Sequence, residues 1–234
     1  MLNLPAISNK ERAAYRKATV LVDRAIVEDD AKVASQLFRD AAQSAEELVE
    51  GRRADPEFNY LAGYINYRTP DKSLDIWKRA EHFLRQAVAL SPDHQFAIYY
   101  LGCLLFDLKR YCESREMMLR IRVDTFKGLN QKWRIAKAYE LVICCDLYLN
   151  PESVSGEHFE GLLSLYRDIG DPVIAPTPSE LGACLSFLIQ SRASQDTLLR
   201  FAVTAFLQLV KHIGLEDMMT ERWPLVAAYG LGLR

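Results

Sequence analysis

The sequence lacks the features of a nucleic-acid-binding, secreted or membrane-spanning protein. Its formal net charge is -2 and its pI is near 6.1, so it has no basic excess for binding phosphates. The first residues lack the charged-then-apolar pattern of a secretion signal. The most apolar run, 201–210, is far shorter than the ~20 residues that a bilayer requires. We therefore expect a cytoplasmic protein with no nucleic-acid or membrane partner.

Patterns typical of metal sites and of catalysis are also missing. The five cysteines form an odd number and no CxxC pair, which indicates reduced thiols. The four histidines are scattered, and none lies three or four residues from a cysteine, as paired ligands of structural zinc would. The sequence has no GxxxxGK[ST] loop, GxGxxG turn, GxSxG elbow or HExxH helix. We expect no catalytic residue, metal or cofactor.

The sequence does contain helical patterns that occur in pairs. From Pro92 to Ile121, Ala97, Leu101 and Leu105 follow at helical spacing, and a break at 109–111 precedes a second short helix. Two short amphipathic helices cannot bury a shared apolar face alone, so each pair needs a similar neighbour. No stretch shows the period-two alternation of a strand, and we predict an all-α protein.

Small–large–small triplets mark the second helix of the earlier pairs. They are Ala34, Phe38 and Ala41 in one pair, and Ala80, Leu84 and Ala87 in the next. With the central pair, this pattern resembles the tetratricopeptide repeat (TPR), in which small residues let neighbouring helices approach closely. The resemblance implies an α-solenoid of antiparallel helix pairs and a role in holding another protein.

The sequence suggests two regions. TPR-like repeats should occupy 9–170, beginning with a Ser8–Glu11 capping box. The segment 171–176, with two prolines, is the clearest linker. Beyond it, we expect a C-terminal helical segment, 177–230, packed on the repeats. The first of its predicted helices starts at a Thr177–Glu180 capping box. The second is capped by Ser194 and runs from Gln195 to Ile213, and a short third helix covers 221–229.

The first helices of TPR-like proteins line a concave groove, and the resemblance carries this role to particular residues. An aromatic groove suits an apolar partner segment, because rigid rings give a large contact area at little cost in side-chain entropy. An aromatic stripe at helical spacing also fits a buried core. The expected partner-binding residues are Asn59, Asn66, Tyr67, Phe96, Tyr99, Phe106, Trp133 and Lys137.

Three interpretations of the function remain open. The chain is interpreted first as a non-enzymatic adaptor that binds a protein or peptide with apolar side chains. Alternatively, it is a dedicated chaperone or an immunity-type inhibitor that sequesters one partner protein. The third interpretation is a structural protein that forms homo-oligomers through the C-terminal helices, whose run 198–210 is apolar on more than one face.

Overall fold

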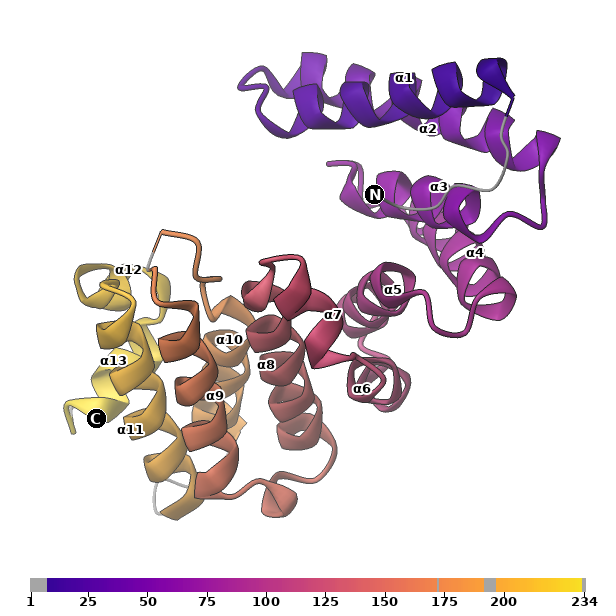
Figure 1. Cartoon of the computed structure of the whole chain (residues 1–234). Helices are drawn as coiled ribbons and strands as arrows, with labels where there is room; N and C mark the ends of the chain where they lie inside the picture. The colour runs from indigo at the N-terminus through magenta and orange to yellow at the C-terminus, as the bar shows by residue number, and fades with distance from the viewer. Residues whose placement is uncertain (1–7, 172, 192–196, 233–234) are drawn as a thin grey trace. The chain divides into compact units, whose positions relative to one another are not determined.

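A computed structural model describes residues 8–171, 173–191 and 197–232, and within them the secondary structure is helical, with no strand. The all-α prediction is confirmed. The chain forms two compact units, Met1–Leu104 and Leu105–Arg234, and the division falls inside helix α5 (Gln95–Asp107). Each unit is built from antiparallel helix pairs (Figure 1).

The first unit contains two such pairs and the greater part of α5. Helices α1 (Asn9–Ile26) and α2 (Ala31–Gly51) pack together, as do α3 (Pro56–Arg68) and α4 (Leu74–Leu90), and α2 packs on α3. Both predicted small–large–small triplets lie in the interior, where Ala41, Ala80, Leu84 and Ala87 have no exposed surface. The small residues let the helices approach, which confirms the pairing inferred from the sequence.

Polar side chains fix where these helices begin. At the start of α1, Ser8 Oγ accepts the backbone N–H of Glu11 at 3.2 Å, and the Glu11 carboxylate accepts that of Ser8 at 2.6 Å. Asp30 caps α2, and Asp55 caps α3 with Pro56 at its first position. These bonds satisfy amides that have no partner within the helix.

The capping box gives a simple test of local stability. We expect Ser8→Ala to lower the free energy of unfolding by about 1 kcal/mol, because the Glu11 amide loses its acceptor. Chemical denaturation measures the change. Substituting the exposed Ser35, whose hydroxyl bonds a carbonyl within α2, should change stability by less than half as much. Equal losses would contradict a capping role for Ser8.

The second unit continues with further helix pairs. After α6 (Tyr111–Leu119) and the short α7 (Val123–Gly128) comes α8 (Lys132–Leu149), which packs on α6 and on α9 (Gly156–Ile169). Helices α10 (Ser179–Ser191) and α11 (Thr197–His212) follow, and then α12 (Met219–Arg222) and α13 (Pro224–Gly230). Single 3₁₀ turns lie at Pro151–Ser153 and Glu216–Met218.

The C-terminal helices pack on the preceding pair within this unit. α10 contacts α8, and α11 contacts α9, so α10 and α11 extend the stack of paired helices (Figure 1). Their shared core includes Tyr166, Leu185 and Phe206, each at most 1% exposed. The proline-containing linker therefore joins two pairs that lie in one compact unit.

Local structure differs from the prediction in two places, and a third prediction falls on residues outside the described ranges. The single helix predicted over 221–229 is wrong, because Trp223 leaves the helical conformation and Pro224, which has no N–H, begins a new helix. Helix α7 was not predicted, since six residues are too few for a periodic pattern. The proposed start of α11 at Ser194 and Gln195 lies outside the described residues.

Candidate functional site

An aromatic face on α3 and α5 is the most distinctive surface of the first unit. It consists of five rings, which we call the aromatic face: Tyr60, Tyr64, Tyr67, Phe96 and Tyr100. The α3 tyrosines follow at intervals of four and three residues, so they lie on one side of that helix. The two α5 rings are four residues apart and also share a side. Two helices, α3 and α5, thus contribute to one surface.

The rings touch one another in a continuous cluster. Tyr60 lies with its ring centroid 5.9 Å from those of Tyr64 and Phe96, and Tyr100 lies 4.7 Å from Tyr64 and 6.0 Å from Tyr67. Four of the rings are half-buried, whereas Tyr100 is 7% exposed and forms the floor. Stacked and tilted rings at such distances support each other and hold a defined shape.

One end of the aromatic face is fixed by a hydrogen-bonded network that joins three helices. Tyr15 of α1 donates its hydroxyl to Glu57 of α3 at 2.8 Å. The other oxygen of Glu57 lies 3.2 Å from His94 Nε2, and the His94 ring lies 4.9 Å from that of Tyr60. Burial, and then the negative charge of Glu57, raise the pKa of the Tyr15 hydroxyl well above its usual range.

The structure places the predicted binding residues of this unit in different environments. Tyr67 and Phe96 belong to the aromatic face, and Tyr99 is 4% exposed, with its ring 5.2 Å from that of Tyr100. Asn59 and Asn66 are each 2% exposed, and Asn66 also lines an open cleft between α2 and α4. Asn59 donates to the carbonyls of Arg53 and Asp55, and Asn66 donates to the Ala62 carbonyl and the Glu46 carboxylate.

Tyr60, Tyr64 and Tyr100 were missed by the sequence reasoning. The signal was present, because Tyr60, Tyr64 and Tyr67 have the spacing of one helix face. The helical register taken from the TPR resemblance predicted instead that Asn59 and Asn66 lie on the binding surface. Consecutive side chains of a helix point in directions ~100° apart. A register that is wrong by one residue therefore assigns buried residues to the binding surface.

The other predicted residues belong to the second unit. Phe106 is half-buried and contacts the rings of Tyr111 and Tyr148 at 5.4 and 6.4 Å. Trp133 is half-buried too, with the Arg134 guanidinium 4.3 Å from its ring. Their binding role, like that of Tyr99, stays a prediction.

Lys137 takes part in a buried ionic cluster between α8 and α10. Its ammonium contacts Glu140 at 3.0 Å and also Glu180 of α10. Glu140, which has no exposed surface, accepts the Leu181 backbone N–H at 3.0 Å. Desolvation opposes the charge of Lys137, but the two carboxylates raise its pKa, whereas burial raises the pKa of Glu140. The cluster anchors the start of α10, and the Glu180 expected in a capping box bonds to Lys137 instead.

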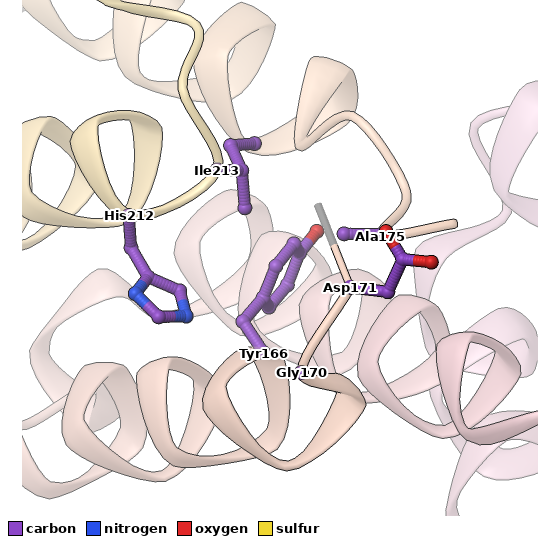
Figure 2. A pocket seen from close by; sticks show the side chains of 6 residues that line it. All are labelled: Tyr166, Gly170, Asp171, Ala175, His212 and Ile213. Atoms are coloured by element: carbon purple, nitrogen blue, oxygen red, sulfur yellow. The ribbon is translucent and has the colours of Figure 1, made fainter. Parts of the chain in front are cut away.

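Two hollows elsewhere have a different character. An open cleft of about 490 Å³ between α2 and α4 has charged walls that include Glu46, Glu47 and Arg79. A small cavity of about 60 Å³ lies where α9 ends, next to the last turn of α11. There the ring of Tyr166 points between Ile213 and Ala175 (Figure 2), and its hydroxyl donates to the Pro176 carbonyl at 2.9 Å. This cavity has room for only a few water molecules.

The described residues provide neither a metal site nor a membrane span. Among residues 8–171, 173–191 and 197–232, no group of three or more His, Cys, Asp and Glu side chains is placed to hold a metal ion. The helices in these ranges include none with the length and apolar character to span a bilayer.

Comparison with known proteins supports the fold. A solved structure from a functional characterization of Pseudomonas aeruginosa pilF has a TM-score of 0.51 to this chain and 17% sequence identity. The match covers 96% of this chain and 92% of that chain. The fold is a TPR-like stack of antiparallel helix pairs. No family model matches the sequence, and no curated protein matches it.

Proposed function

We propose that this protein is an adaptor that holds a partner polypeptide on the aromatic face of α3 and α5. The observation that carries the proposal is the continuous cluster of rings contributed by α3 and α5. Paired helices of this kind bind partner segments through the helix surfaces that they expose. The proposed partner is a protein or peptide segment with apolar side chains.

The chemistry of the face supports an apolar segment as the ligand. Tyr60, Tyr64 and Phe96 present ring surface and are already held by their neighbours, so little side-chain entropy is lost on binding. The α2–α4 cleft, by contrast, has carboxylate and guanidinium groups in its walls, which an apolar segment would have to desolvate. The aromatic face is therefore the better site for such a partner.

The test is capture of partners from lysate, followed by affinity measurement with the identified polypeptide. We expect Tyr64→Ala to weaken binding at least ~10-fold, the effect typical of an anchor residue of an interface. Phe187→Ala is the matched control, because Phe187 lies on α10 in the other unit and is 52% exposed. Circular dichroism confirms that both variants fold. Full affinity in a folded Tyr64 variant would refute the proposal.

The two other interpretations depend on further measurements. Strict one-to-one capture of a single protein would favour a dedicated chaperone or inhibitor. Self-assembly is supported by the exposed rings of Phe187 and Phe201, on α10 and α11, which are 52% and 41% exposed. Light scattering over a concentration series tests it, since a strict monomer would exclude self-assembly.

A further inference from the structure

His94 lies where the aromatic face meets the first turn of α5. It immediately precedes the helix, and its Nδ1 atom accepts the backbone N–H of Ala97 at 3.2 Å. The imidazole therefore caps α5 as a Ser or Asn side chain does elsewhere. Phe96, a ring of the aromatic face, lies within the turn that this bond closes.

The two bonds of His94 determine where its proton lies. An Nδ1 atom that accepts from Ala97 carries no hydrogen, so in the neutral ring the proton is on Nε2. Nε2 then donates to Glu57, and the Glu57 carboxylate accepts from both His94 and Tyr15. The side chains of His94 and Glu57 are only 12% and 11% exposed, so water competes little for these bonds.

Adding a second proton to the ring conflicts with this arrangement. The proton must go to Nδ1, which would then point an N–H at the N–H of Ala97. Positive charge is also unfavourable at a helix N-terminus, although the Glu57 carboxylate favours it. The doubly protonated ring can still donate from Nε2 to Glu57, but it can no longer accept the Ala97 N–H and so no longer caps α5.

We propose that His94 is a proton-sensitive cap that regulates the aromatic face, a role that rests on the proposed function of that face. Histidine gains a proton in mildly acid solution. Protonation at Nδ1 releases the Ala97 amide and loosens the first turn of α5, which then keeps only its backbone bond from the Ile98 N–H to the His94 carbonyl. Phe96 then shifts relative to Tyr60, and the face loses the shape that holds the partner segment.

The charged and titratable groups near His94 come from α1, from the start of α3 and from the turn before α5. Glu57 and Tyr60 face it from α3, and Tyr15 of α1 acts through Glu57. Asp55 caps α3 close by and is committed to the amides of Glu57 and Phe58. Asp93 precedes His94 in the chain. Of these, Glu57 is the carboxylate in direct contact with the imidazole.

Nuclear magnetic resonance tests the cap without any partner. We expect the Nε2–H tautomer at about pH 7.5, and a roughly five-fold fall in the exchange protection factor of the Ala97 amide by about pH 5.5, the effect of a lost cap. His94→Asn retains a capping oxygen but does not titrate, so its Ala97 protection should not change over this range. His82→Asn, on the exposed side of α4, should respond as the wild type does.

Each result supports or overturns the proposal. A proton on Nδ1 in the neutral ring, or the same pH response in His94→Asn, would overturn it. Binding of the captured partner, measured at the two pH values, then tests the regulation: it should weaken in acid for the wild type but not for His94→Asn. Unchanged wild-type binding would overturn the regulation. If Tyr64→Ala binds at full affinity while Ala97 still responds to pH, the face has failed as the binding site and the cap has not.

Discussion

Lys137→Met should lower the free energy of unfolding by about 3–5 kcal/mol, because it leaves the buried Glu140 carboxylate without its cation. Methionine nearly fills the volume of the lysine stem, so the loss of stability arises from the missing charge and not from a change in packing. Glu140 would retain the Leu181 amide but would face Glu180 with no positive charge between them. Urea denaturation monitored by tryptophan fluorescence measures the change.

The pH dependence of this defect gives a second test. Burial raises the pKa of Glu140, and the variant removes the ammonium that lowers it. A group whose folded pKa is raised favours folding below its unfolded pKa, and that advantage is lost as the pH rises through the folded value. The defect of Lys137→Met should therefore be larger at about pH 8 than at about pH 5, where Glu140 can take up a proton.

The matched control is Lys132→Met on the same helix. Lys132 pairs with Asp168 at 3.1 Å, but these side chains are 36% and 46% exposed. An exposed pair contributes at most about 1 kcal/mol, so this variant should be near wild type. Equal losses of unfolding free energy in the two variants would show that burial of the Lys137 cluster does not cause the defect of Lys137→Met. Replacing Lys137 and Glu140 together, by Met and Leu, should restore much of the stability.

Gly182→Ala should destabilise the second unit by about 1–3 kcal/mol through overpacking. A methyl group at this position would lie 2.7 Å from Cε2 of Trp223, and nearer still to the indole nitrogen. Trp223 is 5% exposed and its ring packs edge-on against Phe206 at 5.1 Å, so it has little room to move. The clash outweighs the gain of roughly 1 kcal/mol that alanine normally brings within a helix.

Gly128→Ala is the control for this prediction. Gly128 ends α7 in the same unit, and a methyl group there would have nothing within 4 Å. Denaturation should show wild-type or slightly higher stability for Gly128→Ala and a clear loss for Gly182→Ala. A neutral Gly182→Ala would mean that α10 and Trp223 do not pack as closely as the structure shows.

The aromatic face could be predicted from the sequence only in part. Periodicity indicated that α3 and α5 are helices and that their rings lie at regular intervals. It could not decide which side of α3 would face α2 and α4. That choice depends on packing: Gly63 lies so close to Leu84 that a methyl group there would be 2.7 Å from Cγ. This contact turns Asn59 and Asn66 inward and leaves Tyr60 and Tyr64 on the aromatic face.

The sequence by itself determined most of the helices, because capping residues and apolar spacing act within a few residues of the chain. It predicted the Ser8 box and the buried triplet of Ala80, Leu84 and Ala87. Only the tertiary structure decided which residues meet across helices. The pairing of Lys137 with Glu180, and of His94 with Glu57, joins positions about 40 residues apart, and no local pattern encodes such contacts.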